Sequence, residues 1–387
     1  MKTREYDVAV VGLGAMGAAA LYQLSKTGLN VIGIDKYTPP HAFGSSFGET
    51  RVTRQAIAEG NIYTPLVLRA NKIWEELEAL SGEELFVRCG MVLAAQKKSK
   101  FFQKTLQAAA HHSIPHEIIA SDEIGRRFPA INAAGADSTF YYEPEAGYLR
   151  PEKCIDVQLK LAQANGAHTL FNTEVTNIVE GKTSTSLRLN SNEILIAKKV
   201  IIASGPWIKD MLPDVLGPIL KTHLQTLYWF AIDTEHANKL KVPHMPVFLC
   251  GDEITETTRS FYGFPLVGGA NGGIKFAVHE TSKEVAPEEK DSVVSRTSGK
   301  EVYSFVSLYI NHIKPKTLQA TNCLYTMTPD QNFIIDFKPD NKNVVLISAC
   351  SGHGFKYSAA IGELAARMVI KEKTDIDIGP FALERFK

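Results

Sequence analysis

The chain has 387 residues, of which 42 are Lys or Arg and 42 are Asp or Glu, and 44% are hydrophobic. This composition can bury a large core and excludes an intrinsically disordered chain. The balanced charge argues against a nucleic-acid partner, because such binding normally needs a basic excess or a basic face. The length predicts roughly two domains, since single cores stop growing at about 250 to 300 residues.

The cysteines are odd in number, widely separated and never arranged as CxxC: Cys89, Cys154, Cys250, Cys323 and Cys350. This pattern fits neither a disulfide framework nor a structural zinc site. Residues 1–7 form a short charged segment, and glycines interrupt the apolar run that follows, so this run matches neither a signal peptide nor a membrane span. We therefore expect a reducing compartment, a cytoplasmic location and no membrane partner.

The first motif is a glycine loop between a predicted strand and a predicted helix. Residues 7–11 form the apolar strand, residues 18–24 have helical composition, and Gly12, Gly14 and Gly17 lie between them as GxGxxG. Gly12 allows the tight turn, Gly14 lets the backbone approach a pyrophosphate, and Gly17 lets the helix pack closely on the strand. The helix N-terminus favours phosphate because it carries about half a positive charge.

A second predicted strand, residues 31–34, leads directly to Asp35. At this distance from the glycines, an acidic side chain accepts hydrogen bonds from the ribose hydroxyls of an adenosine and disfavours the 2′-phosphate of NADP. Strand, glycines, helix, strand and acid in this order predict a dinucleotide site. The motif itself does not choose between NAD and FAD.

Further elements follow along the chain. We predict a hairpin from residues 174–179 and 186–189, strands over 198–203 and 343–347, and a helix in which Ile361, Leu364, Ala365 and Met368 share one face. Residues 216–322 predict an antiparallel sheet in a separate domain, and the polar piece 282–300 predicts an exposed loop or insertion.

The histidines His111, His112 and His116 superficially suggest a metal site. No cysteine or carboxylate completes the set, and histidines in a polar linker are usually exposed to solvent. We expect no metal.

Several motifs together resemble one family, the monomeric sarcosine oxidase and N-methyltryptophan oxidase group of FAD-dependent amine oxidases. The resemblance spans nearly the whole chain. It depends on Gly12 to Gly17 with Asp35, on residues 44–54, on residues 261–265, on Gly273 to Lys275 with His279, on Cys323 to Thr326 and on Ser351 to Lys356. It implies an α/β fold with a glutathione-reductase-like FAD-binding domain and a smaller antiparallel-sheet substrate domain. The implied FAD-binding domain comprises residues 1–85, 145–215 and 324–387, and the implied substrate domain comprises 86–144 and 216–323.

The resemblance also implies the cofactor contacts. Cys323 matches the position that carries a covalent thioether to the 8α-methyl of the flavin. Lys356, with the nearby amides of Gly352 and Gly354, would stabilise negative charge on the reduced ring. Arg51 would lie against the ring. The remaining cofactor-binding residues that we expect are Gly12, Gly14, Gly17, Asp35, Lys36, Ser45, Val175 and Gly205.

Substrate contacts follow from the same resemblance. Arg54 and Lys356 would bind the substrate carboxylate, the arginine through a bidentate fork. We place Arg51 and Arg54 three residues apart on a short helix face. Lys275 would lie over the opposite face of the flavin and assist electron transfer to oxygen. We expect the substrate cavity to be lined by Tyr63, Tyr262, Phe264 and Tyr325, with His279 and His353 close to the ring.

The implied activity is oxidation of N-methylated α-amino acids. The amine becomes an imine as the flavin takes two electrons, oxygen is reduced to hydrogen peroxide, and hydrolysis gives the amino acid and formaldehyde. The partners are then a small amine and O2, and we expect a monomer. N-Methyltryptophan and sarcosine are the first substrate candidates.

The sequence is also compatible with other activities. Ile57, Ala58 and Tyr357 depart from the family pattern, which leaves pipecolate, other cyclic imino acids and glycated amino acids as alternatives. Two further alternatives are an NAD-dependent dehydrogenase and a non-catalytic FAD-binding subunit.

Overall fold

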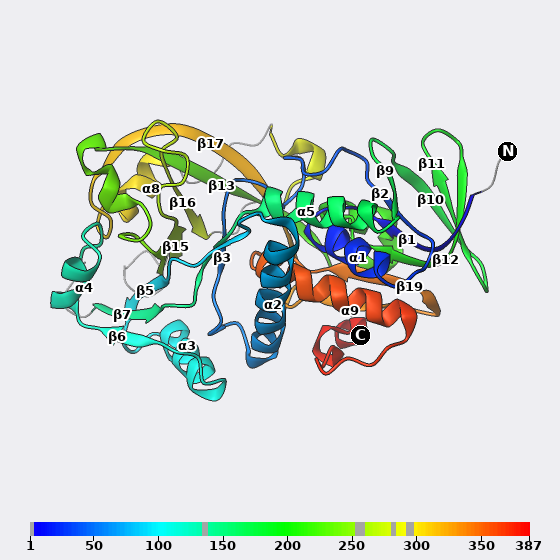
Figure 1. The fold of residues 1–387 in the computed structure, drawn as a ribbon, viewed down its shortest axis with the longest axis horizontal. Coiled ribbons are helices and arrows are strands. Elements are labelled where there is room, and N and C mark those ends of the chain that lie inside the picture. Colours follow the sequence, from blue (N-terminus) through cyan, green and yellow to red (C-terminus); the bar gives the residue numbers. More distant parts are fainter. Residues whose placement is uncertain (1–3, 134–137, 252–259, 280–283, 292–297) are drawn as a thin grey trace.

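A computed structural model describes residues 4–133, 138–251, 260–279, 284–291 and 298–387. Its described strands form two large sheets and one small sheet. The two large sheets lie side by side along the longest axis of the molecule (Figure 1). This α/β architecture of two sheets confirms the predicted fold class.

The first sheet is built on parallel strands. Strand β1 (Arg4–Val11) pairs in parallel with β2 (Val31–Ile34) on one side and β12 (Ile194–Ile202) on the other. In turn, β2 pairs in parallel with β9 (His168–Leu170), and β12 pairs in parallel with β19 (Asn341–Ser348). The remaining strands add to it in antiparallel pairs: β10 (Val175–Glu180), β11 (Thr185–Leu189) and β18 (Ile334–Lys338). Val11 pairs with both Ile34 and Ile202, so the carboxyl ends of three strands meet at one edge of the sheet.

Helices cover both faces of this sheet. One face packs against α1 (Ala15–Ser25), α2 (Thr64–Ser81), α5 (Pro151–Ala164) and α9 (Ser358–Ile370). The other face packs against the short helices α6 (Ile208–Met211) and α7 (Pro213–Leu216). Helix α1 is almost completely buried and packs closely on α9, where a Cβ on Gly362 would lie 2.4 Å from the Cβ of Ala19, so this contact requires small side chains.

The second sheet has the strand order β17-β13-β16-β15-β14-β5-β7-β6. Its pairs are antiparallel except for β5 with β14. The strand bounds are β5 (Met91–Gln96), β6 (Glu117–Ile119), β7 (Ser138–Glu143), β13 (Lys221–Ile232), β14 (Val247–Cys250), β15 (Ser260–Gly263), β16 (Ile274–His279) and β17 (Ile313–Met327). The helices around it are α3 (Lys100–His111), α4 (Ser121–Arg127) and α8 (Gly299–Val306).

The structure confirms the predicted strands and the C-terminal helix, but the predicted helix at Arg51 and Arg54 is wrong. Residues Arg51–Thr53 form strand β3, which pairs with β8 (Gly147–Leu149) in a small sheet completed by β4 (Phe86–Val87). The β-branched residues Val52 and Thr53 favour a strand, and β8 supplies its partner. Of the predicted insertion 282–300, residues 282–283 and 292–297 lie outside the described residues.

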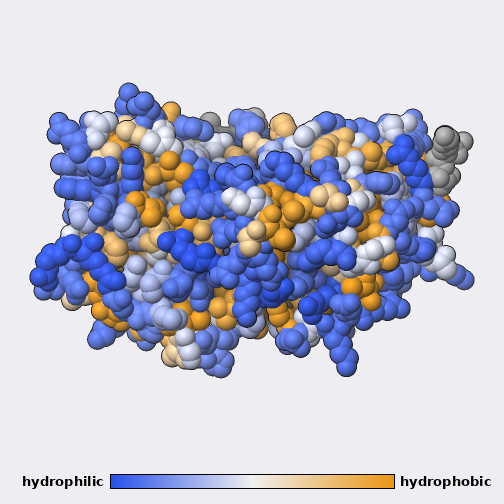
Figure 2. All heavy atoms as spheres, in the orientation of Figure 1, coloured by the Kyte–Doolittle hydropathy of each residue, from blue (hydrophilic) through white to orange (hydrophobic). Residues whose placement is uncertain are grey.

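Hydrophilic residues cover most of the face shown in Figure 2, with hydrophobic residues in several separate groups between them. Within the described residues, no helix combines the length and the apolar character needed to cross a membrane.

Candidate active site

A cavity of about 770 Å³ lies between the two large sheets. Its lining runs from Gly12 and Asp35, at the carboxyl edge of the first sheet, to Cys323 on β17 and Lys356 before α9. Pockets of roughly 300 to 1,000 Å³ are usual for cofactors and small ligands. Strands far apart in the sequence therefore bring most of the predicted site residues into one continuous lining.

The glycine loop has the geometry that the motif requires. Gly12 has a φ of +88°, and a Cβ there would lie 2.6 Å from the Cα of Ser204. A Cβ on Gly17 would lie 1.7 Å from the carbonyl oxygen of Gly12, so the turn and the helix exclude any side chain. Gly14 differs, because the atom nearest to its Cβ position is Ser46 Oγ at 3.7 Å. The open space at Gly14 belongs to the cavity.

Asp35 lines the cavity at the end of β2. Its carboxylate accepts hydrogen bonds from the backbone N–H of Leu13 at 2.7 Å and of Tyr37 at 2.8 Å. These bonds hold the carboxylate beside the glycine loop. Nearby, Lys36 forms an ion pair of 3.0 Å with Glu174, and both line the cavity together with Val175.

Three buried polar atoms of lining residues have no hydrogen-bond partner among the described residues: Ser45 Oγ, Thr326 Oγ1 and His353 Nδ1. Buried polar groups are normally paired, and a bound ligand is one way to pair them. Together with the open space at Gly14 and the helix N-terminus behind it, these atoms make the lining fit a dinucleotide such as FAD.

Cys323 and Arg51 meet in the middle of the lining. The Cys323 thiol is 1% exposed and lies 3.6 Å from Arg51 Nη2. Arg51 donates hydrogen bonds of 2.9 Å to the backbone carbonyls of Thr50 and Ser45. The guanidinium is thus held by neutral carbonyl groups, and its positive charge faces the thiol.

Lys275 lies behind this part of the lining and is not a lining residue. Its ammonium is 2% exposed and donates to the carbonyls of Gly48 at 2.6 Å and Thr50 at 2.8 Å, with the Phe264 ring at 4.3 Å. Burial lowers the pKa of Lys275 well below its usual value, and the neighbouring charge of Arg51 adds to the shift. The lysine fixes the loop that carries Arg51.

Arg54 is paired with a carboxylate that the sequence analysis missed. The guanidinium is 4% exposed and donates to Glu59 Oε2 at 2.7 Å and to the carbonyl of Ala56. Burial opposes the charge of Glu59, but Arg54 and Lys356 outweigh it and hold the pKa of Glu59 well below its usual range. No periodic spacing links Arg54 and Glu59, because residues 55–60 form an irregular loop.

A second missed carboxylate, Glu143 on β7, fixes the same loop. It is fully buried and accepts hydrogen bonds from the backbone N–H of Gln55 at 2.5 Å and of Ala56 at 3.2 Å. Burial raises the pKa of the Glu143 carboxyl, although these two N–H groups oppose the shift. Glu143 therefore positions the turn from which Arg54 enters the cavity.

Lys356 lines the cavity from the turn Phe355–Tyr357 that precedes α9. It is 6% exposed and donates to the carbonyl of His353 at 2.6 Å. Burial lowers the pKa of Lys356 to about 7, while Glu59 raises it and Arg54 lowers it further. The lysine can therefore change charge near neutral pH.

Aromatic side chains form the wall next to these cations. The hydroxyl groups of Tyr262 and Tyr325 lie 3.4 Å apart, and the rings of His279 and Tyr325 are 5.9 Å apart. Phe264 also belongs to the lining, as do Gly205, Gly352 and Gly354. Tyr63 does not: its hydroxyl donates to Asn332 at 2.8 Å, and its ring packs against His353.

A family model described as DAO, FAD dependent oxidoreductase, matches residues 7–368. The chain belongs to this family. The family selects FAD over a nicotinamide cofactor and makes the protein an oxidoreductase. Membership confirms the resemblance drawn from the motifs.

Relatives named N-methyl-L-tryptophan oxidase support the same assignment. Those of Yersinia pestis (strain Pestoides F) and Yersinia pseudotuberculosis (serotype O:1b, strain IP 31758) are each 34% identical over 389 residues, which cover 99% of this chain and 100% of theirs.

Solved structures share the fold at lower identity. The open form of NikD, described as an unusual amino acid oxidase essential for nikkomycin biosynthesis, has a TM-score of 0.84 at 21% identity and covers 98% of this chain and 97% of its own. L-Proline dehydrogenase from P. horikoshii has a TM-score of 0.83 at 18% identity, and the match covers 100% of this chain and 98% of the dehydrogenase chain.

Substitution by alanine should change a different property at each of two glycines: protein stability at Gly17 and flavin binding at Gly14. Gly17→Ala places a Cβ against the Gly12 carbonyl and should destabilise the flavin-free protein by more than about 3 kcal/mol. Gly14→Ala makes only an ordinary contact of 3.7 Å with Ser46 Oγ and should keep stability within about 1 kcal/mol, yet lower the flavin content of the purified protein. Urea unfolding and flavin absorbance measure the two effects. Normal flavin content in Gly14→Ala would contradict the assignment of this end of the cavity.

Proposed function

We propose that the enzyme oxidises N-methylated α-amino acids with an aromatic side chain, with N-methyl-L-tryptophan as the reference substrate. Oxygen is the acceptor, and the products are the amino acid, formaldehyde and hydrogen peroxide. The observation that carries this proposal is the full-length similarity to proteins named N-methyl-L-tryptophan oxidase. When bound, FAD supplies the two-electron acceptor that no amino-acid side chain provides.

The cations of the cavity support a substrate with a carboxylate. Arg54 and Lys356 are both buried in the lining, where a charged hydrogen bond to a carboxylate is stronger than in water. Glu59 holds Arg54 in the absence of substrate, so a substrate carboxylate must compete with Glu59 for the guanidinium. Glu59 is then a positioning residue for Arg54.

The aromatic wall supports the rest of the substrate. Tyr262, Tyr325, Phe264 and Phe101 offer ring surfaces that suit an indole or another apolar group. A cavity of this kind also penalises an ammonium ion, which favours the neutral amine whose lone pair is needed for oxidation. The protein thus selects the reactive protonation state of the substrate.

The same lining would hold FAD. We propose that Gly12, Gly14 and Asp35 bind its adenosine and pyrophosphate, that Arg51 and Lys275 stabilise negative charge near its ring, and that Cys323 attaches it covalently. The position of the buried Cys323 thiol in the cavity lining, 3.6 Å from Arg51 Nη2, supports the attachment.

We also propose that residues 1–85, 145–215 and 324–387 form the FAD-binding part and that 86–144 and 216–323 form the substrate part. Strand β17 continues across the boundary at 323/324, which places Cys323 where the two parts meet. Five free cysteines and exposed hydrophobic residues in separate groups support a monomer in a reducing cytoplasm.

The proposed function is tested by mixing the purified flavoprotein anaerobically with N-methyl-L-tryptophan, sarcosine, pipecolate and a glycated amino acid in turn. N-Methyl-L-tryptophan should bleach the flavin fastest, and air should then restore the colour with formation of hydrogen peroxide. If pipecolate or a glycated amino acid bleaches the flavin faster than N-methyl-L-tryptophan does, the proposed substrate is wrong and that compound takes its place.

Cys323→Ser tests the covalent attachment. The wild-type protein should retain its yellow colour in the pellet after acid precipitation, whereas Cys323→Ser should release the flavin to the supernatant. Cys350→Ser is a matched control, because Cys350 also lines the cavity. Release of flavin from the wild type would remove the covalent link from the proposal.

Glu59→Gln tests the competition for Arg54. The variant removes the competing charge and should lower KM for an N-methyl amino acid by about tenfold at pH 6, if Glu59 costs substrate binding roughly 1.4 kcal/mol. Asp330→Asn is the control, because Asp330 lines the cavity but pairs with Arg385 at 2.9 Å. A higher KM in Glu59→Gln would contradict the competition, because it would show that the positioning of Arg54 by Glu59 matters more than the competing charge.

The charge of Lys356 predicts a pH dependence of substrate binding. Because burial lowers the pKa of Lys356 to about 7, the ammonium is present below this pH and is lost above it. The carboxylate should therefore bind more weakly, with a rising KM, as the pH increases from about 6 to about 8. Lys356→Met should have a high KM without this step. If KM of Lys356→Met rises with pH in the same way as KM of the wild type, a group other than Lys356 causes the pH dependence.

A further inference from the structure

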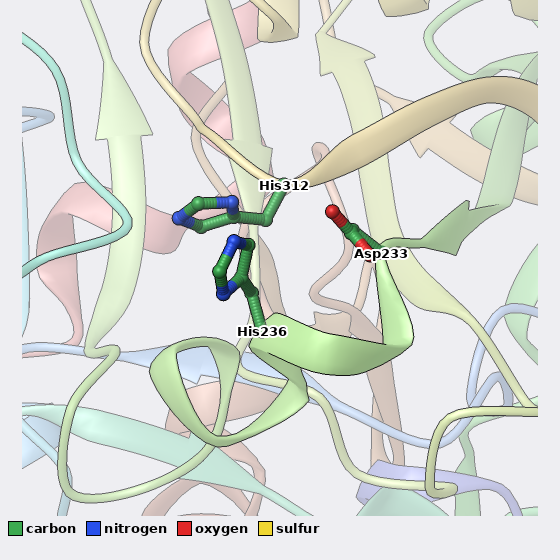
Figure 3. Close-up of side chains that lie close together, drawn as sticks. All are labelled: Asp233, His236 and His312. Atoms are coloured by element: carbon green, nitrogen blue, oxygen red, sulfur yellow. The ribbon is translucent and has the colours of Figure 1, made fainter.

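Three residues outside the cavity lining come together beside the second sheet. Asp233, His236 and His312 each offer one possible metal-ligand atom, and these atoms all lie within 4.8 Å of one another. Figure 3 shows the two imidazole rings beside each other, with the Asp233 carboxylate directed toward His312. All three residues are partly buried, so the place is reached by solvent.

The long strand pair of the second sheet fixes this arrangement. Ile232 on β13 is in register with Ile313 on β17, which brings the next residue, Asp233, beside His312. The backbone N–H of Asp233 donates to the carbonyl of His312 at 2.8 Å. His236 follows within the short helix Thr234–Leu240, where its N–H donates to the carbonyl of Asp233 at 3.0 Å. The fold thus joins two distant parts of the sequence at one point.

His312 is held in an uncommon backbone conformation. Its φ is +66°, in the left-handed region that residues other than glycine seldom adopt. The rings of His236 and His312 lie with their centroids 4.0 Å apart. Backbone strain that the surrounding structure maintains is typical of functional positions.

We propose that Asp233, His236 and His312 bind one divalent transition-metal ion of the Zn²⁺ type. Two imidazole nitrogens and one carboxylate oxygen are a common three-ligand set for this ion, and water completes the coordination in an open site. The ion joins the end of β13 to the start of β17, the strand that also carries Cys323. It thereby stabilises the sheet without taking part in the oxidation.

Lys239 gives the proposal a sharp test. Its ammonium lies 3.5 Å from His312 Nε2, where it repels a cation bound nearby. Metal binding requires this flexible side chain to move away. Removal of its charge by Lys239→Gln should therefore tighten metal binding, a result that a purely structural role of the cluster does not produce.

The experiment is calorimetric titration of the chelator-treated holoenzyme with ZnCl2, together with thermal unfolding in the presence and absence of Zn²⁺. Wild type should bind one ion and gain thermal stability, since an ion that binds only the folded state stabilises it. His236→Gln should weaken binding by more than about tenfold. Lys239→Gln should strengthen it.

His111→Gln is the matched control for adventitious binding. The rings of His111 and His112 are 4.6 Å apart, yet the described residues place no third ligand beside them. His111→Gln should bind Zn²⁺ as wild type does. The proposal is overturned if wild type binds no stoichiometric ion, or if His236→Gln binds as tightly as wild type. Should His236→Gln fail to fold, unchanged or weaker binding in Lys239→Gln overturns it instead.

Discussion

The cavity depends on buried cations that are held mainly by neutral carbonyl groups. Arg51, Lys275 and Lys356 each donate to backbone carbonyls. Within the described part of the chain, Arg54 is the one of these four side chains that forms an ion pair, with Glu59. Burial of an ion is costly without compensation, but carbonyl groups supply hydrogen bonds without cancelling the charge. The interior therefore keeps a positive field from Arg51 and, below about pH 7, from Lys356. Such a field favours anionic ligands, a flavin that gains negative charge and a substrate carboxylate among them.

The rest of the scaffold keeps these cations in place through the loops that carry them. Glu152 at the start of α5 accepts the N–H of Gly48 at 2.6 Å, and Trp229 on β13 donates to Glu49 at 3.0 Å. Lys275 binds the same loop from β16, and Glu143 on β7 holds the following turn. Three strands of the second sheet and helix α5, which covers the first sheet, thus converge on residues 44–60. This explains why a cofactor and a substrate can be proposed for one cavity between the sheets.

The sequence predicted the parts of the structure that follow local rules. Strands, glycines and Asp35 at the start of the chain were predictable because hydrophobic period and turn chemistry act within a few residues. The helix expected at Arg51 was wrong, since pairing with β8 decides the conformation there. Glu59 and the cluster at His312 were missed, because their partners are set by an irregular loop and by strand register between distant segments. No sequence spacing encodes such contacts.

The most direct test of the positive cavity compares N-methyl-L-tryptophan with its carboxamide, which has the same amine and indole but no carboxylate charge. Anaerobic stopped-flow absorbance gives the flavin reduction rate and the apparent Kd for each. We expect the acid to bind at least about a hundredfold more tightly than the amide, which corresponds to roughly 2.8 kcal/mol from the buried cations. Equal binding of acid and amide would show that the buried cations do not recognise the substrate, and would contradict the account.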